Sequence, residues 1–157
     1  MEDRDVLTLN APGSGRSVVF AMDPEGGEIW CRKSWGPNGG DQVVLNLEAK
    51  SVVSGGREFE TTPSITIAWL DTPFDFQRLA GRTIEIATSF NEVVGDYMTT
   101  FYHDEHQNLE DVSIEFCKLD GKRVRLKVRG STDDLYGDQK VAISLQTFVT
   151  LVDRHNR

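Results

Sequence analysis

Apolar and polar residues alternate with a period of two along most of the chain. The longest such run is Asp41–Val53, in which Val43, Leu45, Leu47, Ala49 and Val53 share one parity. Five later segments repeat the pattern: Ile65, Ile67 and Trp69; Ile84 and Ile86; Val112, Ile114 and Phe116; Val124, Leu126 and Val128; and Val141, Ile143 and Leu145. This alternation predicts strands with one face on a core and one face in water.

Shorter strands are predicted at Val6–Leu9, Ser17–Ala21, Glu28–Cys31 and Asp96–Tyr102. One segment departs from the alternation. Thr72 supplies a capping hydroxyl, Pro73 fits a first helical position, and Gly81 is the residue expected just past a helix. We therefore predict a helix of about two turns near residues 73–80.

These elements define the expected fold. Many short strands separated by turn residues favour an all-β, antiparallel β-sandwich or a partly closed barrel of about 8–10 strands with one short helix. No repeat or linker divides the sequence, so a single β domain over residues 1–157 is expected.

Composition narrows the classes of protein that remain. The chain has 38% hydrophobic and 27% charged residues, a formal net charge of −8 and a pI of about 4.8. Acidity argues against a nucleic-acid partner. No apolar run reaches the ~20 residues that span a bilayer, so no membrane association is expected. The N-terminal residues lack a signal-peptide pattern, and we expect a cytoplasmic protein. The two cysteines, Cys31 and Cys117, are expected to be small core residues.

Residues 122–129 contain five cations in an otherwise acidic chain. Arg123, Arg125, Lys127 and Arg129 would project from one face of a strand, as in a phosphate-binding strip. A three-residue loop ending at Gly121 would place Glu115 opposite Arg125 and Asp111 opposite Arg129. Such pairs, and the lack of an aromatic residue among the outward positions, favour a solvated, internally paired face over a polyanion site.

The segment His103-Asp104-Glu105-His106 gathers ligand-type side chains. Histidines three apart point to opposite faces of a strand, and could share a metal only if the segment forms a turn. A mobile hairpin tip is favoured. The alternative is a divalent transition-metal site built from His103, His106 and the carboxylate of Asp104 or Glu105.

Two further loops contain candidate residues. Asp133, Asp134 and Asp138 could offer oxygen ligands to calcium, although the spacing of an EF-hand is absent and an Asp-rich turn is favoured. Trp35 follows Arg32 in a glycine-rich loop, where packing of the indole under the loop is favoured; if exposed, the tryptophan could anchor a partner. Arg32, Trp35 and Tyr136 are therefore the candidate partner contacts.

No convergent catalytic set is visible, which favours a protein without enzymatic activity. We expect a non-catalytic binding or interaction protein that uses loops at one end of a β-sandwich, with another protein as its partner and no cofactor. The alternative is a metal-binding module or metal-dependent enzyme centred on His103 and His106. A carbohydrate-binding module is a third class, which the missing signal-peptide pattern disfavours.

Overall fold

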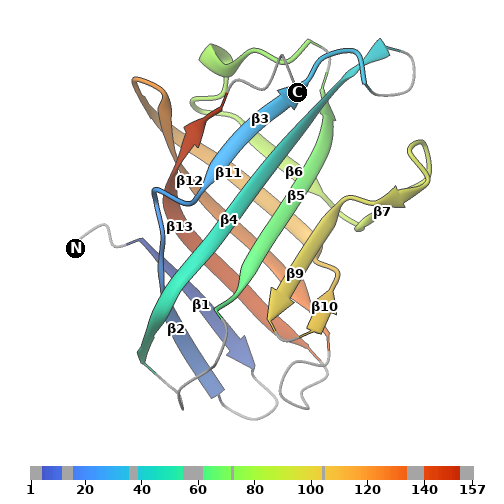
Figure 1. Ribbon diagram of the computed structural model, residues 1–157. Helices are drawn as coiled ribbons and strands as arrows, with labels where there is room; N and C mark the ends of the chain where they lie inside the picture. The colour runs from blue at the N-terminus through green and yellow to red at the C-terminus, as the bar shows by residue number, and fades with distance from the viewer. Residues whose placement is uncertain are drawn as a thin grey trace.

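The computed structural model describes residues 5–11, 16–35, 39–54, 62–71, 73–103, 105–133 and 140–152. Within them the chain is all-β, as predicted (Figure 1). The strands are β1 (Val6–Ala11), β2 (Arg16–Met22), β3 (Glu28–Arg32), β4 (Asp41–Ser54), β5 (Ser64–Asp71), β6 (Thr83–Ile86), β7 (Phe90–Asn91), β8 (Asp96–Tyr97), β9 (Thr99–His103), β10 (Glu105–Gln107), β11 (Glu110–Asp120), β12 (Arg123–Thr132) and β13 (Val141–Leu151).

One large sheet curls on itself to form most of the fold. Its strand order is β10-β9-β5-β4-β2-β1-β13-β12-β11-β6, and β3 pairs with both β4 and β13. The ring β1, β2, β4, β3 and β13 is therefore closed, and the remaining strands extend it in two layers. Figure 1 shows β3, β4, β5 and β9 in front of β13, β12, β11 and β6. Among the described strands, β10 and β6 end the strand order, so the sheet is open beyond the closed five-strand ring.

The apolar face of each long strand is directed into the space between the two layers. Leu45, Ile67 and Leu126 are fully shielded from water, and the largest buried side chains are Phe20, Phe101 and Phe116. Each such side chain contributes about 1.5–3 kcal/mol through burial. The period-two pattern therefore identifies this core correctly.

A second, smaller apolar cluster covers the outer face of the front layer. Trp30 pairs with Val44, and Val44 pairs with Ala68, so three neighbouring strands supply adjacent outward side chains. Met98 and Val94 complete the cluster from the segment that contains β7 and β8. This contact attaches the β7–β8 hairpin to the outside of the sheet.

The predicted two-turn helix is instead a single 3-10 turn, η2 (Phe76–Arg78). Its cap is Asp75, whose carboxylate accepts from the Gln77 N–H at 3.0 Å, while Thr72 lies outside the described residues. The Phe74 N–H donates to the Asp41 carboxylate at 2.9 Å, so the start of the segment is bonded to the first residue of β4 rather than to a helical turn. Gly81 has the expected positive φ, at 83°.

Register shifts explain where the alternation fails. Val53, predicted to be inward, is 56% exposed. The neighbouring residues Met22 and Ala21 of β2 pair with Ala49 and Ser51 of β4, so one β4 residue between them is left unpaired. A second register shift of this kind lies between Phe20 and Val19. Each bulge adds a residue to β4 and reverses the direction in which the following side chains point.

The β11–β12 hairpin also differs from the expected register. Gly121 has a positive φ of 63°, as expected, but the loop is only Gly121-Lys122 because Asp120 already pairs with Arg123. A bulge between Phe116 and Lys118 then changes the register by one residue, so that Phe116 pairs with Leu126 and the two inward faces still match. Cys117 lies in this bulge and is exposed, so its predicted core position was wrong.

This shift changes the charge pairing on the outer face. The predicted cross-strand pairs Glu115–Arg125 and Asp111–Arg129 are replaced by Glu115–Lys127 and Ser113–Arg129. Phe148 of β13 also lies between the outward cations, with its ring 4.8 Å from the Arg123 guanidinium and 5.2 Å from that of Arg125. The expected internal neutralisation was therefore wrong in its pairs, and an aromatic side chain is present on this face.

Candidate functional site

The two layers separate along one side of the molecule, between β5 and β6. β5 pairs with β9 only through residues 64–67, and the Ala68 N–H then donates to the Met98 carbonyl at 2.7 Å. Beyond this point the described residues provide β5 with no further strand partner on that side. β6, on the opposite layer, pairs only with β11. A cleft of about 560 Å³ lies between these two free edges.

Backbone geometry fixes which groups of β6 face the cleft side. The Phe116 N–H donates to the Arg82 carbonyl at 2.9 Å, so this carbonyl points towards β11, whereas the Arg82 N–H donates to the Leu79 carbonyl at 2.9 Å. Because these directions alternate along an antiparallel strand, Ile84 and Ile86 also face β11. Thr83 and Glu85 consequently present their N–H and C=O groups at the free edge.

Polar contacts close the two ends of the cleft. At one end, Arg82 forms an ion pair with Asp71 at 2.9 Å, which connects the start of β6 to the end of β5. At the other end, the Ser89 hydroxyl donates to the Thr99 carbonyl at 2.9 Å, and the Ser89 N–H donates to a Glu110 carboxylate oxygen at 2.8 Å. The opening is therefore limited to the stretch between these ties.

Apolar side chains from both layers line the cleft between these ties. Trp69, Ile84 and Ile86 approach it from the main core, whereas Ala68 and Met98 belong to the outer cluster. Trp69 is 6% exposed, and its indole nitrogen has no hydrogen-bond partner among the described residues. A buried donor without an acceptor costs about 1–3 kcal/mol. A ligand carbonyl within reach of this N–H would remove that cost.

The rim of the cleft combines exposed aromatic rings with carboxylates. Phe90 is 46% exposed and Tyr97 is 56% exposed, and their rings meet edge to face at 5.2 Å. Glu85 and Glu92 also line the opening, and neither forms an ion pair within the described part of the chain. Since Arg82 is already paired with Asp71, the free charge at the rim is negative.

The predicted partner contacts at Arg32 and Trp35 lie together at the end of β3. Trp35 is 50% exposed, and the Arg32 guanidinium stacks 5.2 Å from its ring and 4.8 Å from the ring of Trp30. The arginine therefore covers one side of the exposed indole. This leaves a smaller free aromatic surface than an isolated exposed tryptophan would offer.

Asp41 holds this loop against the segment that follows β5. Its carboxylate accepts the N–H groups of Phe74 and Ser34, each at 2.9 Å, and the ammonium of Lys33 at 3.1 Å. The Phe74 N–H, the Ser34 N–H and the Lys33 ammonium hold the pKa of Asp41 below its ordinary value, although burial acts in the opposite direction. A buried, ionised carboxylate thus connects the Trp35 loop to the chain leading into β6.

The structure does not bring the two candidate histidines together. His103 is 4% exposed and lies inside the barrel, with its ring centroid 5.5 Å from that of Phe20. His106 pairs with Tyr102 on the outer face, where their ring centroids are 4.7 Å apart. Glu105 is exposed opposite His103, and Asp104 lies outside the described residues. Because His103 pairs with Glu105 and His106 pairs with Tyr102, the two imidazoles lie on opposite faces, as extended geometry requires.

The remaining candidates lie at the end of β12. Asp133 is exposed, whereas Asp134, Tyr136 and Asp138 lie outside the described residues. Among the residues that are described, no three His, Cys, Asp or Glu side chains are grouped in a way that could hold a metal ion. No helix in the same residues is long and apolar enough to cross a membrane.

Sequence reasoning did not identify the cleft. It placed Ile84 and Ile86 correctly on an inward face, but the free edge of β6 depends on strand order, which alternation does not encode. The one available signal was the shortness of this strand beside the turn-rich residues 87–96. Comparison with known proteins finds no matching family model, no matching curated protein and no matching solved structure.

Proposed function

We propose that this chain is a non-catalytic binding protein that holds an extended segment of a partner protein in the cleft between β5 and β6. The observation that carries the proposal is the position of an unpaired strand edge beside an apolar cleft. An extended segment can bond to such an edge through its own backbone, with side chains entering the pocket. Four residues of edge match a short recognition segment.

Charge and apolar surface define the partner segment. Glu85 and Glu92 favour basic side chains, because the cation at the rim, Arg82, is already paired. Trp69, Ile84 and Ile86 favour alternate apolar side chains directed inward. The expected ligand is therefore an extended segment in which lysine or arginine alternates with β-branched residues.

The class of protein is the one expected from the sequence, but the binding surface is different. The Trp35 loop lies at one end of the barrel, and Arg32 already covers part of its ring. The metal-binding alternative has no supporting geometry, since His103 and His106 lie on opposite faces. A cytoplasmic location and a protein partner remain part of the proposal.

The test uses a synthetic octapeptide of alternating lysine and valine, titrated into the isotope-labelled chain and followed by amide NMR. We expect shifts at Leu70, Thr83 and Glu85, and slower hydrogen exchange of the Thr83 and Glu85 amides. An octapeptide of alternating lysine and serine keeps the charge and removes the apolar contacts. It should bind at least tenfold more weakly.

Two substitutions of Glu85 distinguish the contribution of the strand edge to binding from the contribution of the negative charge. Glu85→Pro removes an edge N–H without removing a bond to β11, and should abolish binding. Glu85→Gln keeps the N–H and should weaken binding only severalfold. If the peptide shifted amide signals over the whole acidic surface, and both variants bound it equally weakly, strand addition would be refuted. Shifts confined to Trp35 and Arg32 would return the binding surface to the loop.

A further inference from the structure

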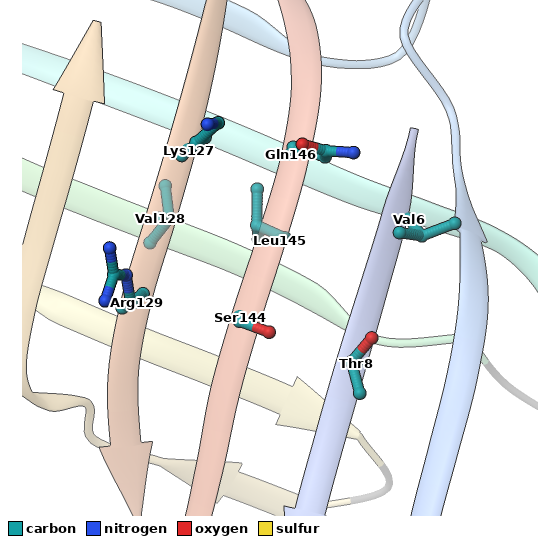
Figure 2. Close-up of a pocket in the computed structure, with 8 residues that line it drawn as sticks. All are labelled: Val6, Thr8, Lys127, Val128, Arg129, Ser144, Leu145 and Gln146. Carbon is teal, nitrogen blue, oxygen red and sulfur yellow. The ribbon is translucent and has the colours of Figure 1, made fainter. Parts of the chain in front are cut away.

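A second depression lies on the outer face of β12, β13 and β1 (Figure 2). It measures about 250 Å³. Lys127 and Arg129 stand on β12, Ser144 and Gln146 on β13, and Val6 and Thr8 on β1. Ser144 is the smallest of these outward side chains, so the surface is lowest at the middle strand. Figure 2 shows its hydroxyl directed across to the side of Thr8.

Strand register explains why the two cations are available at this place. Arg129 pairs with Ser113 on β11 and with Ser144 on β13, so both of its cross-strand neighbours are uncharged. Lys127 pairs with Glu115 and Gln146. Neither cation forms an ion pair within the part of the chain that the structure describes.

The other two cations of the stripe are engaged elsewhere. Arg125 lies 3.7 Å from Asp5, and the rings and guanidinium groups of Phe148, Arg123 and Arg125 stack together. Lys127 and Arg129 are the two outward cations of β12 that line the depression, and they are two residues apart and so roughly 7 Å apart along the strand. This is the size of a site for one anionic group, not for a long polyanion.

We propose that this depression binds the phosphoryl group of a small phosphorylated ligand. A phosphate monoester carries close to two negative charges and three strong acceptor oxygens. The Arg129 guanidinium offers a planar pair of donors that suits two of these oxygens, and the Lys127 ammonium supplies a second charge. The hydroxyl groups of Ser144 and Thr8 stand on the floor and far wall as neutral donors.

This site is independent of the cleft. It lies on β12, β13 and β1, whereas the cleft is bounded by β5 and β6. The chain as a whole has a net charge of −8, which repels long polyanions. A small ligand with one phosphoryl group meets the local positive charge without extending over the surrounding acidic surface.

The experiment titrates inorganic phosphate into the labelled full chain at constant ionic strength, with chloride as the comparison. We expect saturable shifts at Thr8, Ser144 and Arg129. Arg129→Gln and Lys127→Gln should each weaken binding at least tenfold. Arg123→Gln makes the same change of charge on the same strand outside the depression, and should change affinity less than twofold. The amide spectra of all variants report whether the fold is retained.

Two further ligands identify the source of the phosphoryl group. A nucleoside monophosphate and a sugar monophosphate that both bind as inorganic phosphate does would support recognition of the phosphoryl group alone. Tighter binding of one of these two monophosphates would support the proposal and would identify whether a nucleoside or a sugar carries the phosphoryl group. Equal weakening by all three variants, or shifts that do not saturate, would refute a defined site. Stronger binding of a single-stranded oligonucleotide, lost equally in Arg123→Gln, would replace it with a polyanion strip along β12.

Discussion

The cleft between β5 and β6 and the basic depression on β12, β13 and β1 show two ways in which one curled sheet exposes a surface. The cleft occurs where the sheet is interrupted, so its walls include core side chains such as Trp69 and Ile84. The depression occurs where the sheet is continuous, and its chemical groups are outward side chains such as Arg129 and Ser144. Binding and stability should therefore be linked in the cleft and separable on the basic face.

The largest expected contrast comes from truncating one residue in each region. Trp69→Ala removes a buried ring that packs against Phe116 at 6.1 Å, and should lower the free energy of unfolding by about 3–5 kcal/mol. Arg129→Gln should change it by less than about 0.5 kcal/mol, because the side chain is exposed and unpaired with any described acid. Urea denaturation followed by circular dichroism measures both.

Trp69→Phe refines this contrast, because it keeps an aromatic ring and removes the indole N–H that lacks an acceptor. It should cost clearly less than Trp69→Ala. A loss below about 1 kcal/mol for Trp69→Ala would mean that the cleft wall is not part of the core, and the difference between the regions would disappear.

A second prediction concerns Asp41, which ties the Trp35 loop to the segment leading into β6. Its folded-state pKa lies below the ordinary value of about 3.9, because the N–H groups of Phe74 and Ser34 bond to the carboxylate. A depressed pKa adds stability that is fully present above the unfolded-state value and is lost as the pH falls through the folded-state value. Asp41→Asn should cost about 1.5–3 kcal/mol at pH 7, and less as the pH falls below about 4.

Urea denaturation at several pH values between 7 and 2.5 measures this difference. Asp133→Asn is the matched control, since Asp133 is an exposed acid in a loop, and its curve should follow that of the unsubstituted chain. A constant difference between Asp41→Asn and the unsubstituted chain over the whole range would contradict the assignment.

These regions also differ in how far the sequence could predict them. The alternation identifies inward residues such as Leu45 and Ile84 because the side-chain period of a strand is local. The cleft depends on β6 having β11 as its strand partner, which is a long-range fact. The basic face depends on a two-residue hairpin loop, together with a bulge at Cys117, that sets Arg129 opposite Ser113 instead of Asp111, and no local pattern marks that bulge. Among the predicted site residues, the histidine pair was separated by the same period-two rule that located the core.

The smallest expected effect tests the charge cluster of the basic face. Arg125, Lys127 and Arg129 point to the same side of one strand, and like charges so placed repel each other. Arg129→Gln should therefore raise the free energy of unfolding by about 0.2–0.5 kcal/mol at low salt, because its cross-strand neighbours Ser113 and Ser144 are uncharged and no attraction is lost with it. The gain should vanish in 1 M sodium chloride, where the Debye length is about 3 Å. Lys140→Gln, an exposed change outside the cluster, should have no such effect.

The same variant gives opposite outcomes with and without ligand. Arg129→Gln should be the more stable chain in chloride, and the less stable chain once phosphate is added at many times its dissociation constant, because ligand binding stabilises only the chain that retains the site. Glu85→Gln in the cleft should change stability by less than about 0.5 kcal/mol under both conditions. If phosphate stabilised Arg129→Gln and the unsubstituted chain equally, the repulsion on β12 would have no connection with ligand binding. If the order of the two free energies of unfolding reverses on adding phosphate, the cation cluster lowers stability in the free chain and raises it in the chain that has bound the anion.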